Sequence, residues 1–163
     1  MLHDNPASCT VGNKRRRTLL AIQLAGRSFA IVAETGRAHL RQRKLVYVVD
    51  DDPSMLRGVQ RLLKEHGYDT VSFTSANSFH DHNDFRRAVC VVLDIDLDGE
   101  SGIAVHRQLK SAGIQLPVIY MTAKDCPAVR KAAVASGCLA YLTKPFTARS
   151  LIEPIERASI TGA

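Results

Sequence analysis

Val89-Cys90-Val91-Val92-Leu93-Asp94 is an apolar run that ends on a carboxylate. Consecutive apolar residues rich in Val, between polar segments, are typical of a strand that is buried on both faces of a parallel sheet. In open α/β sheets, binding and reacting groups gather at the carboxyl ends of the strands. Asp94 is therefore the first candidate for a functional residue.

Three other strand-like segments also end on polar residues. Residues 45–49 run into Asp50-Asp51-Asp52, residues 118–121 run into Thr122, and residues 139–142 run into Thr143-Lys144-Pro145. The carboxyl ends of parallel strands meet at one edge of a sheet, so we expect these side chains to lie close together. Several carboxylates in one crevice repel one another unless a cation offsets their charge. The sequence therefore predicts a cation-dependent site at this edge.

Helical segments alternate with the strands. The predicted strands are 45–49, 70–73, 89–94, 118–121 and 139–142, and helices are predicted to begin near residues 53, 76, 101, 127 and 147. Pro154 is expected to kink or shorten the last helix, which should end near residue 159. Five strands that alternate with five helices predict an α/β fold with a doubly wound five-stranded parallel sheet, of the flavodoxin-like (βα)5 type.

The charge of the chain is concentrated in its first part. Residues 1–44 carry nine Lys and Arg against Asp4 and Glu34, a net charge of +7, whereas the remainder has a net charge of −1. We expect 1–44 to be a basic, weakly ordered extension that does not resemble the domain at 45–160. A helix packed on that domain and a targeting segment are the alternatives. The apolar stretch in the extension is broken by Gln23 and Arg27, too soon for a membrane span.

The predicted site has the composition of a magnesium site that supports phosphoryl transfer. Three carboxylates, Asp50, Asp51 and Asp94, without His or Cys, suit a hard divalent cation such as Mg²⁺. A carboxylate beside such an ion can act as a nucleophile and form an acyl phosphate. Phosphoryl transfer also needs charge neutralisation, which Lys144 can supply, and a hydrogen-bond donor, which Thr122 can supply.

The chain from Leu45 to about Ala158 resembles the receiver domains of two-component response regulators, the CheY-like family. The resemblance is carried by Val49-Asp50-Asp51-Asp52-Pro53, Leu93-Asp94, Met121-Thr122-Ala123 and Tyr141-Leu142-Thr143-Lys144-Pro145-Phe146. Each motif is weak alone, but four in this order at the ends of the first, third, fourth and fifth strands are specific. The resemblance covers about 70% of the chain and excludes residues 1–44.

The resemblance implies a phosphorylated, Mg²⁺-binding site. Asp94 would be the phosphoacceptor and would attack the phosphohistidine of a sensor histidine kinase or a phosphotransfer protein. Asp51, Asp94 and the main-chain carbonyl of Asp96 would be Mg²⁺ ligands, and Asp50 would act largely through metal-bound water. The domain would therefore be a phosphoacceptor in signalling rather than a turnover enzyme.

The resemblance also implies a conformational switch. Thr122 and Lys144 would bind phosphoryl oxygens, and Tyr141 would turn inward as Thr122 moves toward the phosphoryl group. The changed surface would consist of the fourth helix, the fifth strand and the fifth helix, and would bind a downstream protein or a second copy of the chain. Pro154 lies on this expected surface.

The loop after Asp94 departs from the family pattern. Asp98 stands where the family usually has Pro, and Asp96 and Lys124 occupy positions at which the family tunes the lifetime of the phosphoryl group. We predict an ion pair between Asp96 and Lys124 that partly covers the site. If this pair matters, Lys124→Ala should change the dephosphorylation rate.

Three alternatives remain beside this interpretation. Residues 94–99 resemble a calcium loop, but Val105 stands where such a loop needs Glu. Asp96-Leu97-Asp98-Gly99 resembles the nucleophile motif of haloacid-dehalogenase-type phosphatases, which carry it on their first strand. The third alternative keeps the fold and is a protein-interaction module that works without phosphorylation.

The sequence thus predicts a stand-alone cytoplasmic receiver. The near-neutral domain does not support nucleic-acid binding, and no DNA-binding domain is visible in the sequence, so direct contact with nucleic acid is not expected. The four cysteines lack the spacing of a metal site or a redox pair, which fits a reducing compartment. No membrane association is expected.

Overall fold

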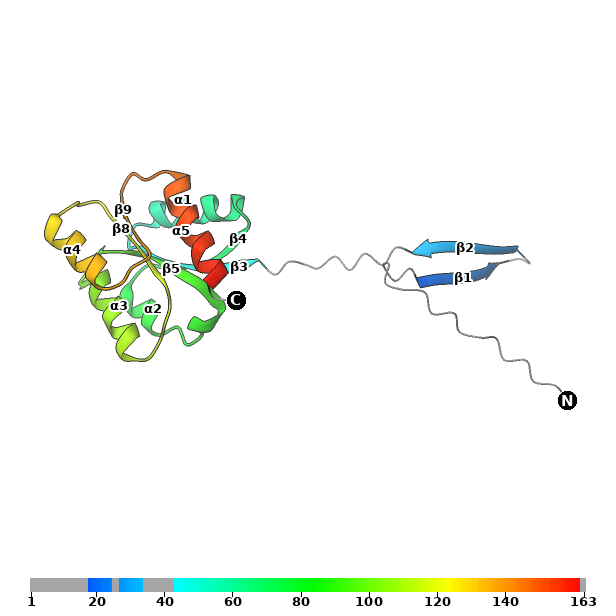
Figure 1. Cartoon of the computed structure of the whole chain (residues 1–163), viewed down its shortest axis with the longest axis horizontal. Helices are drawn as coiled ribbons and strands as arrows, with labels where there is room; N and C mark the ends of the chain where they lie inside the picture. Colours follow the sequence, from blue (N-terminus) through cyan, green and yellow to red (C-terminus); the bar gives the residue numbers. More distant parts are fainter. Residues whose placement is uncertain (1–17, 25–26, 34–42, 162–163) are drawn as a thin grey trace. The chain divides into compact units, whose positions relative to one another are not determined.

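The computed structural model describes residues 18–24, 27–33 and 43–161 (Figure 1). The chain divides into two compact units, Met1–Gln42 and Arg43–Ala163. In the first unit, β1 (Thr18–Leu24) and β2 (Arg27–Ala33) form an antiparallel pair in which Thr18 lies opposite Ala33. The sequence analysis did not predict this pair. Most of the residues assigned to a weakly ordered extension lie outside the described residues, so that assignment stays a prediction.

The second unit is built on a five-stranded parallel sheet with the order β4-β3-β5-β8-β9. The strands are β3 (Lys44–Val49), β4 (Tyr68–Phe73), β5 (Ala88–Asp94), β8 (Val118–Thr122) and β9 (Ala140–Thr143). They alternate with α1 (Pro53–Glu65), α2 (Ala76–His80), α3 (Gly102–Ser111), α4 (Pro127–Ala135) and α5 (Ala148–Thr161). The strand order runs second, first, third, fourth and fifth along this unit, which confirms the doubly wound, flavodoxin-like fold.

Both faces of the sheet are buried, as the apolar runs predict. Successive side chains of a strand point to opposite faces, so each central strand contributes to two hydrophobic cores. Val91 and Leu93 of β5 pack with α2, α3 and α4, whereas Cys90 and Val92 pack with α1 and α5. All four of these side chains are fully buried. The run 89–94 is therefore the central element of both cores.

Local signals set most of the helix boundaries. The Asp52 carboxylate accepts a hydrogen bond from the Ser54 amide (2.8 Å) and caps α1, whose first residue is Pro53. Pro154 lies inside α5, which continues to Thr161, so Pro154 does not end this helix early; the alternative expectation, a kink, stays a prediction. Proline removes only one helical hydrogen bond, and the buried face of α5 holds the helix against the sheet.

Three short elements were not predicted. They are a 3₁₀ turn, η1 (Phe85–Arg87), and the antiparallel strands β6 (Asp96–Leu97) and β7 (Glu100–Ser101). Elements of two or three residues are too short to show a hydrophobic period. The pair β6–β7 forms the loop that follows Asp94 and therefore shapes the predicted site.

Gly102, the first residue of α3, lies against the end of β5. Its amide donates a hydrogen bond to the Ile95 carbonyl (2.9 Å), and an added Cβ would overlap the main-chain carbonyl oxygen of Asp94. The same Cβ would lie 3.1 Å from Leu93 Cγ. Only glycine therefore allows α3 to begin this close to the residue at the centre of the site.

Gly102→Ala is expected to lower the free energy of unfolding by about 2–3 kcal/mol, because either α3 or the end of β5 must move. Urea unfolding measures this loss. Gly58→Ala is the matched control, since nothing lies within 4 Å of the added Cβ on the exposed side of α1. That substitution should be neutral or should stabilise α1 by about 0.5–1 kcal/mol. Equal stability of the two variants would contradict the contact.

A buried polar network joins α3, β8 and the end of α4. His106 Nδ1 lies 2.8 Å from the Tyr120 hydroxyl, which lies 3.1 Å from Ser136 Oγ. Ser136 Oγ donates a hydrogen bond to the Ala133 carbonyl (2.6 Å). Burial, with a smaller contribution from Lys110, lowers the pKa of His106. The folded protein therefore favours the neutral imidazole.

This histidine should make stability depend on pH. Below a pH of about 6.5, His106 becomes protonated in the unfolded chain but stays neutral in the folded chain. The free energy of unfolding therefore falls as the pH is lowered, until the pH reaches the pKa of His106 in the folded protein. Between about pH 7.5 and about pH 5.5, His106→Gln should lose less stability than the unchanged protein, because Gln does not titrate. Urea unfolding at the two pH values checks this, and parallel losses in the two proteins would contradict it.

Candidate functional site

Three carboxylates meet at the carboxyl edge of the sheet. Asp50 and Asp51 follow β3, and Asp94 is the last residue of the neighbouring strand β5. One oxygen from each carboxylate lies within 4.8 Å of the others. Asp50 and Asp94 are buried, whereas Asp51 is exposed. The two strand ends therefore form the acidic cluster that the sequence predicts.

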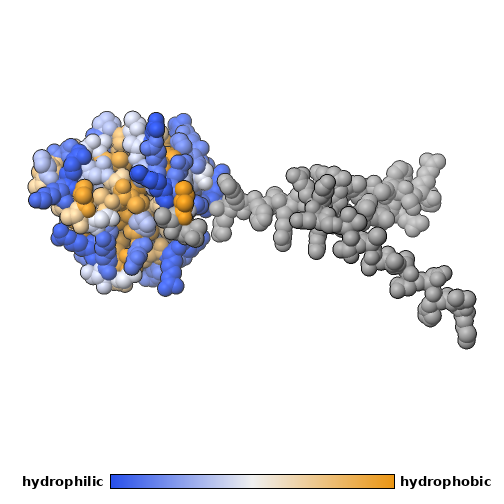
Figure 2. Space-filling view, in the orientation of Figure 1, coloured by the Kyte–Doolittle hydropathy of each residue, from blue (hydrophilic) through white to orange (hydrophobic). Residues whose placement is uncertain are grey.

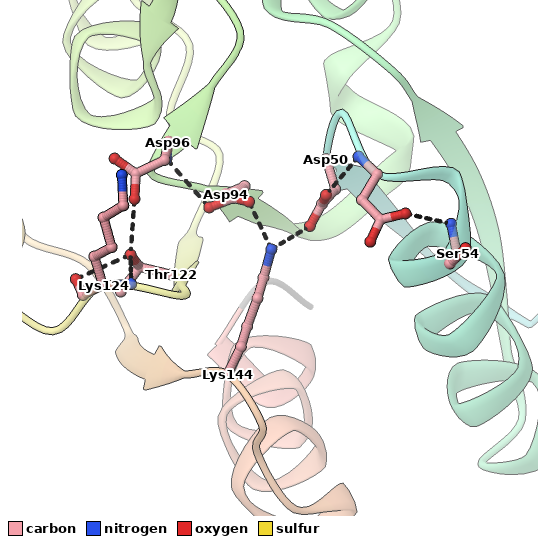
Figure 3. A network of polar contacts seen from close by, with 8 residues as sticks. Asp50, Ser54, Asp94, Asp96, Thr122, Lys124 and Lys144 are labelled. Carbon is pink, nitrogen blue, oxygen red and sulfur yellow. Dashed lines mark hydrogen bonds and ion pairs between the residues drawn. The ribbon is translucent and has the colours of Figure 1, made fainter.

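Lys144, in the loop between β9 and α5, points into this cluster (Figure 3). Its ammonium donates hydrogen bonds to Asp50 Oδ2 and Asp94 Oδ2, both at 2.6 Å. The Lys144 amide donates to the Thr122 carbonyl (2.8 Å), which fixes the loop against β8. Burial alone would lower the pKa of Lys144, but the hydrogen bonds to the two carboxylates outweigh it, and the pKa is raised. Lys144 is therefore a charged counter-ion to both acids.

Asp94 is held at both of its carboxylate oxygens. Lys144 bonds Oδ2, and the Asp96 amide donates to Oδ1 (3.2 Å). Burial raises the pKa of Asp94 above its ordinary value, although Lys144 and the Asp96 amide act in the opposite direction. A carboxylate that is desolvated and fixed in direction is better prepared to act as a nucleophile than one in water.

Thr122, at the end of β8, is fully buried and faces the loop after Asp94. Its single hydroxyl proton has two acceptors in reach, Asp96 Oδ2 (3.2 Å) and the Lys124 carbonyl (3.1 Å), and the hydroxyl oxygen accepts from the Lys124 amide (3.0 Å). In the part of the chain that the structure describes, no ion pair joins Asp96 to Lys124, so the predicted pair is wrong for this state. The Asp96 carboxylate bonds Thr122 instead.

Tyr141 lies on the edge strand β9 and contacts the side chains of Arg130 and Asp125. The Arg130 guanidinium lies 4.6 Å from the centre of the Tyr141 ring and bonds Asp125 Oδ2 at 2.7 Å. The Tyr141 hydroxyl donates to Asp125 Oδ1 (3.4 Å). The hydrogen bond from Arg130 lowers the pKa of Asp125, and burial raises the pKa of Tyr141. The sequence analysis did not identify Asp125 or Arg130, because nothing local marks a contact between α4 and β9.

The donor set fits Mg²⁺. The cluster offers oxygen ligands only, and the exposed Asp51 leaves it open to solvent. Among the described residues, the cluster does not include the Asp96 carboxylate, and the predicted ligand from Asp96 is its main-chain carbonyl. That ligand stays a prediction. The ion would neutralise charge on phosphoryl oxygens.

Comparison with known protein families settles the class of protein. The family model described as the response regulator receiver domain matches residues 46–156. The chain belongs to the response regulator receiver family. Response regulators are components of two-component systems, and phosphorylation and Mg²⁺ binding are typical of their receivers. The resemblance stated from the four motifs is therefore confirmed.

Individual relatives agree with this assignment. The receiver is 34% identical over 129 residues to the response regulator protein TodT of Pseudomonas putida, covering 77% of this chain and 56% of TodT. It is 31% identical to the transcriptional regulatory protein TdiR of Thauera aromatica, covering 69% of this chain and 50% of TdiR. The solved structure of response regulator StyR aligns with a TM-score of 0.67 at 32% identity, over 74% of this chain and 61% of that one. The chain thus spans about half the length of the relatives that it matches.

The structure arranges the residues that the sequence analysis selected in three groups. Asp50, Asp51, Asp94 and Lys144 lie together. The Thr122 hydroxyl is turned toward Asp96, whose amide bonds Asp94. Tyr141 lies apart from both groups, beside Arg130 and Asp125. Among the described residues, no helix is long and apolar enough to cross a membrane.

Proposed function

We propose that this receiver accepts a phosphoryl group on Asp94, with Mg²⁺, from the phosphohistidine of a sensor histidine kinase or a phosphotransfer protein. The observation that carries the proposal is the fixed, desolvated carboxylate of Asp94 between two further acids and the Lys144 ammonium. This is the arrangement that phosphoryl transfer requires: an oriented nucleophile with positive charge beside the developing negative charge.

The transfer is a displacement at phosphorus. A carboxylate oxygen of Asp94 forms a P–O bond as the P–N bond of phosphohistidine breaks, and the imidazole leaves with the electron pair and takes a proton from solvent. The product is an acyl phosphate on Asp94. The Lys144 ammonium already donates a hydrogen bond to Asp94 Oδ2, and after the transfer it can donate to a phosphoryl oxygen instead. Thr122 reaches that group only after its hydroxyl leaves Asp96.

We propose that the signal leaves through the surface of α4, β9 and α5. Tyr141 and Arg130 lie there together with two exposed apolar side chains, Val134 (64% exposed) and Leu139 (39% exposed). In Figure 2, apolar residues show between hydrophilic ones on the face in view. Tyr141 is half-buried and Arg130 is exposed, and aromatic, Arg and aliphatic side chains at the surface are typical of protein contacts. A downstream protein or a second copy of the chain is the proposed partner.

The location and the mode of output belong to the same proposal. The net charge of −1 over residues 45–163 favours protein contact over direct contact with nucleic acid by the receiver. Membership of the receiver family supports a cytoplasmic location and a signalling role rather than enzymatic turnover.

Intact-mass measurement with acetyl phosphate tests the function. A gain of ~80 Da that requires Mg²⁺ and disappears with a chelator is expected for an acyl phosphate. A folded protein that binds Mg²⁺ without gaining this mass would contradict the proposed chemistry. It would favour an interaction module that works without phosphorylation.

A further inference from the structure

Asp96 contacts both the proposed phosphoacceptor and Thr122 (Figure 3). Its amide donates to Asp94 Oδ1 (3.2 Å), and its own Oδ2 accepts from the Thr122 hydroxyl (3.2 Å). Asp96 is exposed, whereas Thr122 is fully buried. An exposed carboxylate in the short strand β6 is therefore within hydrogen-bond distance of a buried hydroxyl in β8.

We propose that Asp96 is a positioning residue that holds the Thr122 hydroxyl away from the phosphoacceptor until Asp94 is modified. The proposal rests on the function proposed above and assigns the Asp96 carboxylate to Thr122, in place of the predicted ion pair with Lys124. A hydroxyl has one proton, so Thr122 cannot donate fully to Asp96 and to a phosphoryl oxygen at the same time.

The second acceptor of the Thr122 hydroxyl does not replace this restraint. The Lys124 carbonyl lies two residues along the same loop, so it moves together with Thr122. Among the described contacts, Asp96 Oδ2 is the side-chain group that joins the Thr122 hydroxyl to the segment following Asp94. The contacts of Tyr141 with Arg130 and Asp125 do not involve Asp96.

Phosphorylation of Asp94 would release the restraint by charge. The phosphoryl group brings about two negative charges to Asp94, and Asp96 follows it two positions along the chain. Like charges at this range repel, so the Asp96 side chain turns toward solvent, which its exposure allows. Thr122 is then free to donate to a phosphoryl oxygen. The carboxylate thus favours the unmodified arrangement and disfavours the modified one.

Two substitutions separate the hydrogen bond from the charge. Asp96→Ala removes both, whereas Asp96→Asn removes the charge and keeps an acceptor oxygen. Asp96→Ala should accelerate labelling by acetyl phosphate about threefold to tenfold, the range expected for loss of one hydrogen bond. Asp96→Asn keeps an acceptor for the Thr122 hydroxyl and should therefore accelerate labelling less than Asp96→Ala does. Asp98→Ala is the matched control, because Asp98 is an exposed acid of the same loop and has no described bond to Thr122. This substitution should leave the labelling rate near that of the unchanged protein.

The Thr122→Val background decides between restraint and simple repulsion. Without the hydroxyl there is nothing for Asp96 to hold, so Asp96→Ala should give no further acceleration there. Acceleration by the same factor in that background, or by Asp98→Ala in the unchanged protein, would overturn the proposal. Absence of any mass gain in the unchanged protein would instead overturn the proposed function.

A second measurement does not depend on phosphorylation. The Lys124 amide donates to Thr122 Oγ1 (3.0 Å), so its proton resonance reports the direction of the Thr122 hydroxyl. This resonance should shift in Asp96→Ala and stay in place in Asp98→Ala. An unchanged resonance in Asp96→Ala would show that Asp96 does not position Thr122.

Discussion

Asp94→Asn should gain no Mg²⁺-dependent mass from acetyl phosphate. Asn keeps the shape of the side chain, but its single carbonyl oxygen replaces only one of the two oxygens that accept from the Asp96 amide and from Lys144, and it is a poor nucleophile. Intact-mass spectra with and without Mg²⁺ measure the effect. Asp98→Asn is the control and should label as the unchanged protein does, since Asp98 is exposed.

Unfolding does not explain this loss, because Asn at position 94 is expected to keep or raise stability. Burial raises the pKa of Asp94, which means that the ionised form is less favourable in the folded chain than in the unfolded one. Above the folded pKa the acid therefore costs stability, and the neutral amide avoids that cost. Labelling that persists in Asp94→Asn would place the acceptor on another residue and would contradict the assignment.

Lys144→Met should lower the free energy of unfolding by about 3 kcal/mol without Mg²⁺, because it leaves two buried carboxylates without their counter-ion. The Asp50 side chain is fully buried, and those of Asp94 and Lys144 are 7% and 13% exposed, so solvent screens the pair little. Met keeps most of the length of the side chain and removes the ammonium with its two hydrogen bonds. Urea unfolding measures the loss.

Magnesium should restore part of the stability of Lys144→Met. A divalent cation at the acidic cluster supplies the missing charge, and in the unchanged protein it must compete with the Lys144 ammonium. The gain on adding Mg²⁺ should therefore be larger in the variant. Lys124→Met is the control, since Lys124 is exposed, and it should change stability by less than about 0.5 kcal/mol. Equal gains in all three proteins would contradict the role of Lys144 as counter-ion.

The sequence sufficed for the sheet and for the acids at its edge. Val91 and Val92 show why. They are neighbours in the chain, and both are fully buried, each on a different face of the sheet. This is the pattern of a strand that has helices packed on both faces of its sheet. Asp50, Asp94 and Lys144 then meet because parallel strands end together. The topology thus brings together residues that lie up to 94 positions apart.

The contacts of Asp96, Asp125 and Arg130 could not be predicted in the same way. Each contact depends on the direction of a single side chain. The elements involved are short: β6 has two residues and α4 has nine. The sequence placed Asp96 near Lys124 correctly in space, but attraction between exposed charges is weak and the buried Thr122 hydroxyl is the better partner. The predicted shortening of α5 at Pro154 failed for a related reason, since tertiary contacts of α5 outweigh the local preference of proline against a helix.

The sheet separates two hydrophobic cores, and this has a consequence for communication within the domain. Side chains of α1 and α5 contact one face, and those of α2, α3 and α4 contact the other. The close-packed strands between them leave no path for a side chain to pass through. Side chains of the two halves can therefore contact one another only around the edge of the sheet, and Lys144, Asp94 and Thr122 lie at its carboxyl edge.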